Sequence, residues 1–149
     1  PAFTYLHLPE KRAEVERHGL ITIGDVGYLD NDGYLYLSDR KRDMILSGGT
    51  NIYPAEIESV LHGMPGVADC AVFGIPDDVF GESVCAHVEL KPNAKLSSSD
   101  VAAWLKERLA SYQVPKTIKI DGELPREESG KIMKRKIRDL YWSGAGRSI

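Results

Sequence analysis

The fold of this chain is decided largely by one stretch, Asp39-Arg-Lys-Arg-Asp-Met-Ile-Leu-Ser-Gly-Gly-Thr-Asn-Ile-Tyr-Pro-Ala-Glu-Ile-Glu58. A charged cluster at residues 39–43 comes directly before a short apolar run at residues 44–46, and the pair Gly48-Gly49 ends that run. Pro54 then starts an amphipathic segment, at the position of a helix where proline is favoured. This order predicts an exposed joint, a buried strand, a loop whose backbone can approach a ligand, and a helix.

The bulk composition indicates a soluble globular protein. The chain has 149 residues, of which 42% are hydrophobic and 28% are charged, which fits one small domain carrying a piece of another. The net charge of −3 gives no general attraction to nucleic acid or to an anionic membrane, so neither is an expected partner. The N-terminus lacks an initiator methionine and the features of a signal peptide, and no apolar run is long enough to span a bilayer. We therefore expect a cytoplasmic fragment of a longer protein.

Cysteine and histidine residues give no sign of a metal site. Cys70 and Cys85 are the two cysteines, and both lie in apolar, strand-like runs without a Cys-x-x-Cys spacing. We expect two buried, reduced thiols. The four histidines are scattered and have no carboxylate or cysteine partner at a useful spacing in the sequence, so we predict neither a zinc site nor a Ser/His/Asp triad.

The hydrophobic pattern predicts an α+β fold without repeats. Two aromatic and aliphatic runs around Asp32-Gly33 predict a hairpin at about residues 26–37. Ser97 and Asp100 predict a capped helix start. Further strands are expected at residues 44–46, 52–53, 67–73, 83–90 and 117–120, with a turn at residues 74–78, and helices at residues 8–17, 54–61, 97–109 and 133–140.

Three short stretches rich in glycine and charged residues stand out: Gly24-Asp25, residues 40–51, and Pro125-Arg-Glu-Glu-Ser-Gly-Lys131. Together, and in this order, they make residues 19–141 resemble the adenylate-forming ligases, which include acyl- and aryl-CoA synthetases, luciferases and the adenylation domains of peptide synthetases. Members of this family join a carboxylic acid to ATP, forming an acyl-adenylate and pyrophosphate, and a thiol such as that of CoA then displaces AMP. Their small C-terminal domain swings between two orientations, one for each half-reaction.

The resemblance implies a division of the chain into three parts. Residues 1–41 would be the end of the large N-terminal domain, with a hairpin remnant at about 26–37. Residues 42–141 would be the small mobile domain, with a three-stranded mixed sheet packed by helices and a two-stranded β-hairpin piece. Residues 142–149 would be a disordered tail.

The resemblance also assigns roles near the joint. Asp25 matches the aspartate that binds the ribose hydroxyls of ATP, and Arg40 matches an arginine on the ribose side of the nucleotide. Arg42 falls at the hinge position. Judged from the neighbouring residues alone, Asp25 is better explained as a turn residue and Arg42 as part of a solvated charged loop. The match to the family motifs favours the assigned roles instead.

Two further roles concern the acceptor thiol and the acid. Ser47, Gly48 and Gly49 match the loop that lines the pantetheine tunnel, although a simple turn would use the same glycines. Lys131 matches the catalytic lysine, whose ammonium meets the charge that develops on the α-phosphate. A lysine in a glycine-containing loop is otherwise an ordinary surface residue. The resemblance further suggests Lys131 as a target of a lysine acetyltransferase and deacetylase.

These assignments predict the C-terminal part of an AMP-forming acyl-CoA synthetase. Its co-substrates would be a carboxylic acid, fatty or aryl, together with ATP and CoA. ATP and Mg²⁺ would be bound mainly by the enzyme's own N-terminal domain, so we expect this chain alone to be inactive. Two alternatives remain open: an adenylation domain that loads a carrier protein, and a non-catalytic binding module with the same fold.

Overall fold

The computed structural model describes residues 5–8 and 10–143, which divide into two compact units, Pro1–Arg42 and Asp43–Ile149. The division falls after Arg42, one residue beyond the expected domain boundary at 41/42. Trp142, which we placed in the tail, is instead the last residue of a helix, while residues 144–149 of that expected tail lie outside the described residues. No helix in the described part of the chain is long and apolar enough to cross a membrane.

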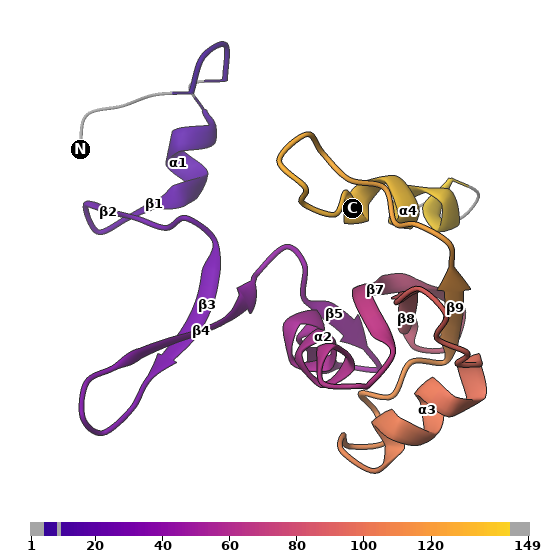
Figure 1. The fold of residues 1–149 in the computed structure, drawn as a ribbon. Coiled ribbons are helices and arrows are strands. Elements are labelled where there is room, and N and C mark those ends of the chain that lie inside the picture. Colours follow the sequence, from indigo (N-terminus) through magenta and orange to yellow (C-terminus); the bar gives the residue numbers. More distant parts are fainter. Residues whose placement is uncertain (1–4, 9, 144–149) are drawn as a thin grey trace. The chain divides into compact units, whose positions relative to one another are not determined.

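The first unit consists of a short helix and two antiparallel hairpins (Figure 1). Its elements are α1 (Lys11–Val15), β1 (Glu16–Arg17), β2 (Leu20–Ile21), β3 (Asp25–Leu29) and β4 (Leu35–Arg40). The predicted hairpin is confirmed as β3–β4, and its turn is held by the Asp30 carboxylate, which accepts hydrogen bonds from the backbone N–H groups of Asp32 and Tyr34. The helix expected at residues 8–17 is shorter than predicted, and Pro9 lies outside the described residues.

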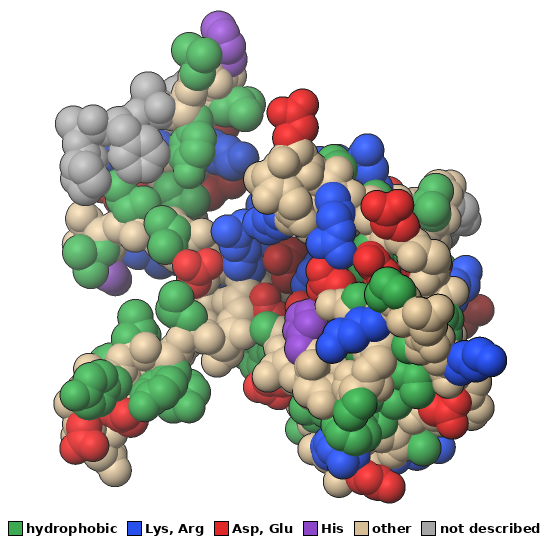
Figure 2. All heavy atoms as spheres, in the orientation of Figure 1, with side chains coloured by type: hydrophobic (Ala, Val, Ile, Leu, Met, Phe, Trp, Pro, Cys, Tyr) green, Lys and Arg blue, Asp and Glu red, His purple; other side chains and the backbone are tan. Residues whose placement is uncertain are grey.

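Large apolar side chains cover the β3–β4 hairpin (Figure 2). Tyr28 and Tyr36 stack across the two strands with 5.1 Å between their ring centroids, and both remain exposed. Leu29, Leu35 and Leu37 are also exposed. An apolar surface of this kind usually packs against another protein body, as a remnant of a larger domain would.

The second unit is built on a mixed five-stranded sheet in the order β6-β5-β8-β7, with β9 also paired to β8. The strands are β5 (Ile45–Ser47), β6 (Thr50–Ile52), β7 (Val67–Asp77), β8 (Gly81–Leu90) and β9 (Thr117–Asp121). The pair β7–β8 is antiparallel and β8–β9 is parallel, which confirms the expected three-stranded mixed sheet. The predicted hairpin piece is β5–β6, and it joins β8 through the pair Ser47 and Gly81.

The turn that we expected at residues 74–78 was placed too early. Gly74 pairs with Val84 inside the β7–β8 ladder, and the turn follows Asp77. Gly74 has a packing role: a Cβ atom there would lie 2.8 Å from the Glu82 carboxylate and 3.3 Å from Ile45. A glycine within a strand is used where other groups approach the backbone closely, and here it does not end the strand.

Helices cover both faces of the sheet (Figure 1). Helices α2 (Pro54–His62) and α3 (Ser98–Lys106) pack on one face and α4 (Lys134–Trp142) packs on the other. Because side chains alternate along a strand, Cys70 and Val72 of β7 join the first core and Ala71 and Phe73 join the second. The predicted capping box of α3 is confirmed, with Ser97 and Asp100 each accepting the other's backbone N–H.

Candidate functional site

Asp25 and Arg40 face each other at the open end of the β3–β4 hairpin. They are direct partners in the strand register, and Arg40 Nε lies 3.8 Å from Asp25 Oδ1. Gly24, with a φ of 85°, turns the chain into β3, and its carbonyl accepts a 2.7 Å hydrogen bond from the Lys41 N–H. The partly exposed Asp25 carboxylate can accept hydrogen bonds from two neighbouring hydroxyls while the guanidinium donates beside it, which suits a ribose.

Arg42 is the last residue of the first compact unit and Asp43 is the first residue of the second. Just before this joint, the Lys41 N–H donates a hydrogen bond to the Gly24 carbonyl. The sequence-predicted hinge residue therefore lies where the two units meet in the chain. Its role as a pivot stays a prediction.

Gly48 and Gly49 form the tight turn of the β5–β6 hairpin, and Ser47 before them is the last residue of β5, paired with Thr50. Gly48 and Gly49 have φ values of 55° and 83°, as a two-residue hairpin turn with two left-handed residues requires. A Cβ atom on Gly48 would lie 2.9 Å from Cδ1 of Phe80, whereas one on Gly49 would meet no atom within 4 Å. The Gly48 N–H also donates to the Phe80 carbonyl at 2.9 Å. The contacts of Gly48 therefore hold this turn against the β7–β8 turn. At Gly49, in contrast, the space that a side chain would take is empty.

Asp77 organises the neighbouring β7–β8 turn. Its carboxylate accepts hydrogen bonds from the Val79 and Phe80 N–H groups, both at 3.0 Å, and from Lys116 Nζ at 2.8 Å. The Lys116 ammonium also lies 4.2 Å from the centre of the Phe80 ring. The hydrogen bond from Lys116, followed by that from the Phe80 N–H, lowers the pKa of Asp77 to about 2. The Phe80 ring beside Gly48 is thus held in place by Asp77 and Lys116.

Lys131 lies at the end of a narrow loop between β9 and α4. Arg126 and Ile132 form an antiparallel bridge across the loop, and the Glu127 N–H donates to the Lys131 carbonyl at 2.9 Å. Gly130, with a φ of 85°, closes the turn by donating its N–H to the Glu127 carbonyl at 2.9 Å. Lys131 itself is exposed. The loop therefore has a defined backbone and presents an ammonium group to solvent.

The structure does not gather all these residues into one constellation. It brings Asp25 and Arg40 together in the first unit and places Ser47–Gly49 and Lys131 on separate loops of the second. No group of three or more His, Cys, Asp or Glu residues that could hold a metal ion occurs within residues 5–8 and 10–143. The expected Mg²⁺ stays a prediction for the N-terminal domain.

Two of the four histidines, His62 and His87, have carboxylate partners that their spacing in the sequence does not reveal. His87 contacts the Asp121 carboxylate through Nδ1 and the Tyr141 hydroxyl through Nε2, the latter at 2.9 Å. His62 Nε2 lies 3.0 Å from Asp69 Oδ1. The partners of His87 are 34 and 54 residues away, so their proximity depends on the tertiary fold. One signal was available: a polar side chain inside the apolar strand at residues 84–88 needs a hydrogen-bonding partner.

Both cysteines are buried and free, as predicted. Burial raises the pKa of Cys70 to about 12 and that of Cys85 to about 11. Neither thiol is activated, because a reactive cysteine needs a lowered pKa and access to solvent. We therefore assign both thiols to packing.

Comparison with known proteins identifies the family. The family model described as "AMP-binding enzyme C-terminal domain" matches residues 56–131, a range that begins in α2 and ends at Lys131. The chain belongs to this family. The matched range contains β7, β8, α3, β9 and the loop after β9 as far as Lys131, whereas β5, β6 and α4 lie outside it.

Relatives of this AMP-binding enzyme C-terminal domain are considerably longer proteins. The chain is 44% identical, over 97% of its length, to a protein from Streptomyces coeruleorubidus named fatty acid–[acyl-carrier-protein] ligase ScoC, of which it covers 28%. It is 47% identical over 92% of its length to a feruloyl-CoA synthase from Amycolatopsis sp, again covering 28% of that protein. The ATP-bound structure of MatB from Rhodopseudomonas palustris superimposes with a TM-score of 0.85 at 37% identity, over 93% of this chain and 28% of that one.

Proposed function

We propose that this chain is the C-terminal part of an ATP-dependent acid–thiol ligase. In the first half-reaction a substrate carboxylate oxygen attacks the α-phosphorus of ATP, the bond to the β-phosphate breaks, and pyrophosphate leaves. In the second half-reaction the sulfur of CoA attacks the acyl carbon and AMP leaves. The observation that carries this proposal is the exposed Lys131 at the end of a closed loop, within the range that matches the family.

Lys131 is the residue we assign to adenylation. Negative charge on the phosphate oxygens grows during attack, and a positioned ammonium stabilises that charge without transferring a proton. Asp25 would accept hydrogen bonds from the ribose hydroxyls, with Arg40 beside it. Ser47, Gly48 and Gly49 would line the path of the acceptor thiol, where glycine backbone permits a close approach.

The decisive test uses Lys131→Ala in the full-length enzyme. Removing one charge-stabilising donor should slow adenylation by at least about 10²-fold. Thioester formation from supplied acyl-adenylate should be nearly unchanged, because Lys131 acts on the first half-reaction. Lys136→Ala is the matched control, since Lys136 is an exposed lysine of α4. An equal loss in both half-reactions would contradict the role of Lys131.

The same proposal predicts that the 149-residue chain alone forms no acyl-adenylate. It covers 28% of each of the two relatives described above, and the acid pocket and the main ATP and Mg²⁺ contacts would lie in the remaining part. Acid-dependent AMP formation by the purified chain would overturn this view. The acid, fatty or aryl, would be selected in that missing part.

A second candidate function is loading of a carrier protein instead of CoA. It is favoured by the 44% identity to the ScoC ligase, whose name specifies an acyl-carrier protein as acceptor. The chemistry is the same, but the acceptor thiol is carried on a protein. Comparing CoA with a phosphopantetheinylated carrier protein as acceptor, at equal thiol concentration, separates the two.

Acetylation of Lys131 would regulate such an enzyme, because it removes the positive charge that adenylation needs. Treatment of the full-length enzyme with a lysine acetyltransferase should lower adenylation, and a deacetylase should restore it. The Lys131→Arg variant should not respond.

A further inference from the structure

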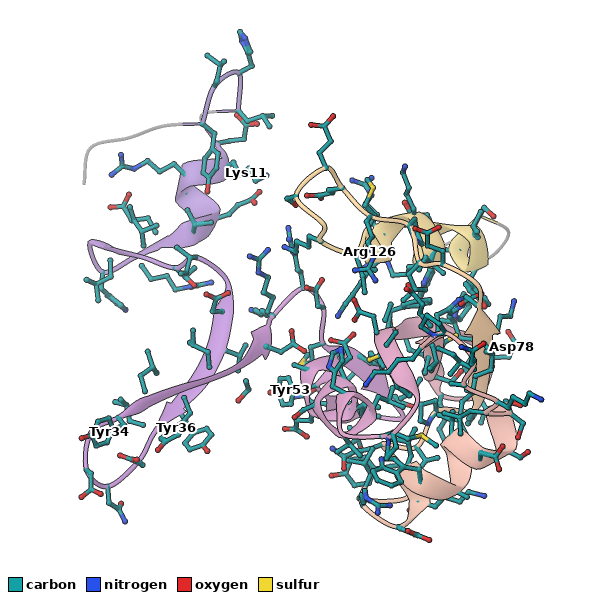
Figure 3. All side chains as sticks on the ribbon, in the orientation of Figure 1. Lys11, Tyr34, Tyr36, Tyr53, Asp78 and Arg126 are labelled. Carbon is teal, nitrogen blue, oxygen red and sulfur yellow. The ribbon has the colours of Figure 1, made fainter. Side chains whose placement is uncertain are left out.

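We propose that Arg126 is a positioning residue that fixes the peptide carrying Lys131 and so aligns the ammonium for adenylation. The inference rests on the proposed function of Lys131. Its structural basis is the guanidinium of Arg126, a residue labelled in Figure 3. This single group connects the Lys131 loop to two carboxylates of the sheet.

Arg126 contacts three acceptors at once. Its Nη1 lies 2.8 Å from Asp69 Oδ2 of β7 and donates at 3.1 Å to the carbonyl of Gly130. Its Nη2 donates to Glu89 Oε2 of β8 at 3.1 Å. One side chain therefore spans from two adjacent strands of the sheet to the residue directly before Lys131.

The two carboxylates are themselves held in place. Glu89 also accepts the backbone N–H of Leu124 at 3.0 Å, which fixes the start of the loop. Asp69 accepts the N–H of Cys70 at 2.9 Å and contacts His62. Burial raises the pKa of Asp69, but hydrogen bonds from His62, Cys70 and Arg126 lower it more, so this carboxylate stays charged at neutral pH. Both carboxylates are thus held by backbone hydrogen bonds where Arg126 binds them.

The Gly130 contact gives Arg126 its effect on Lys131. The Gly130 carbonyl belongs to the planar peptide group that includes the Lys131 nitrogen, so holding this oxygen fixes the plane from which the lysine side chain departs. Gly130 has a φ of 85° and no side chain, so its own backbone restrains the loop weakly. The hydrogen bond from Arg126 to the Gly130 carbonyl supplies the conformational restraint that the glycine backbone lacks.

Arginine suits this task because its planar guanidinium carries five N–H donors in a fixed fork. A lysine at this position would keep the charge but could not hold three acceptors in the same geometry. Glutamine would lose the charge as well. The order of effect should therefore be Arg126→Gln greater than Arg126→Lys.

The test compares Arg126→Gln, Arg126→Lys and the control Arg135→Gln in the full-length enzyme. Arg135 is an exposed arginine on α4 whose guanidinium pairs with Asp139. Hydrogen exchange at Glu127 and Gly130 should become about tenfold faster in Arg126→Gln, since loss of one anchored contact loosens the loop. The kcat of adenylation should fall by about tenfold or more with little change in KM for ATP and acid, because a misplaced Lys131 weakens transition-state contacts first.

The outcomes separate this inference from the proposed function. Arg126→Lys should recover part of the lost kcat, and Arg135→Gln should match the wild type. If Arg126→Gln leaves kcat unchanged while Lys131→Ala abolishes adenylation, Arg126 has no positioning role and the proposed function stands. If Lys131→Ala itself adenylates normally, the proposed function fails whatever the exchange rates show. Equal losses of kcat in Arg126→Gln and Arg135→Gln would also overturn the inference.

Discussion

Asp77 shows how one carboxylate can hold a turn in place. It accepts three hydrogen bonds, and the residues that donate them, Val79, Phe80 and Lys116, include the aromatic residue that packs on Gly48. Its folded-state pKa of about 2 lies below the ordinary value of 3.8. A lowered folded-state pKa means that the charged form stabilises the fold above the ordinary pKa and that this stabilisation is lost as the pH falls.

Substitution of Asp77 should therefore change how stability depends on pH. Above the ordinary pKa of 3.8 the wild type should be more stable than Asp77→Asn, and the difference should shrink as the pH falls from 3.8 toward about 2. Urea unfolding at a series of pH values measures this difference. Asp78→Asn, at an exposed position of the same turn, is the matched control. A pH-independent difference would show that the Asp77 charge does not stabilise the turn.

Single residues also mark what the sequence could and could not predict. Lys131 and Gly48-Gly49 stand out by residue type and spacing, because their neighbours in the chain define the loops that carry them. Arg126 does not stand out, because its acceptors Asp69 and Glu89 come from strands far away in the sequence. His87 is similar, since its partners are distant and belong to β9 and α4. Contacts made by the tertiary fold leave little trace in a single sequence.

The secondary-structure elements were predicted best where local chemistry determines them. Pro54 starts α2 and Ser97 caps α3, as the residues themselves indicate. The expected turn at residues 74–78 failed because Gly74 serves packing against Glu82 and Ile45, which only the folded sheet reveals. A glycine two residues before a proline, as in Gly74-Ile75-Pro76, is ambiguous until its neighbours in space are known.

The β5–β6 turn allows a matched pair of substitutions. Gly48→Ala and Gly49→Ala both place a side chain at positive φ, which costs about 1 kcal/mol of unfolding free energy each. Gly48→Ala should lose about 1 kcal/mol more, because its Cβ would collide with the Phe80 ring. Chemical denaturation measures both losses.

A double-mutant cycle checks the cause of this difference. In a Phe80→Ala background the extra loss of Gly48→Ala should disappear, because the colliding ring is gone. If the two alanine variants are equally stable in the wild-type background, the ring does not restrict this turn.

The whole chain consists of two compact units that meet in sequence between Arg42 and Asp43. The boundary between the two units falls within the charged stretch at residues 39–43, where the sequence predicted an exposed joint. The role of the joint in the full-length enzyme follows from the proposed function, because two half-reactions would need two arrangements of the same domains.

Arg42→Pro tests the joint. Proline fixes the φ torsion near −65°, so the variant should be unable to adopt one of the two arrangements. In the full-length enzyme we expect one half-reaction to slow by at least about tenfold more than the other, a difference of ~1.4 kcal/mol in barrier. Arg42→Ala should change both by less, since alanine leaves the torsion free. Equal rates of both half-reactions in Arg42→Pro and wild type would exclude a pivot at this residue.

The packing of helices on both faces of the sheet has one practical consequence. The two tryptophans of the chain lie on opposite faces: Trp104 of α3 donates to the Val60 carbonyl, and Trp142 of α4 donates to the Gly74 carbonyl, both at 3.1 Å. Each indole is thus a natural fluorophore for one core. Variants that keep a single tryptophan would report separately on detachment of α4, together with the lysine loop that precedes it, and on melting of the remaining domain.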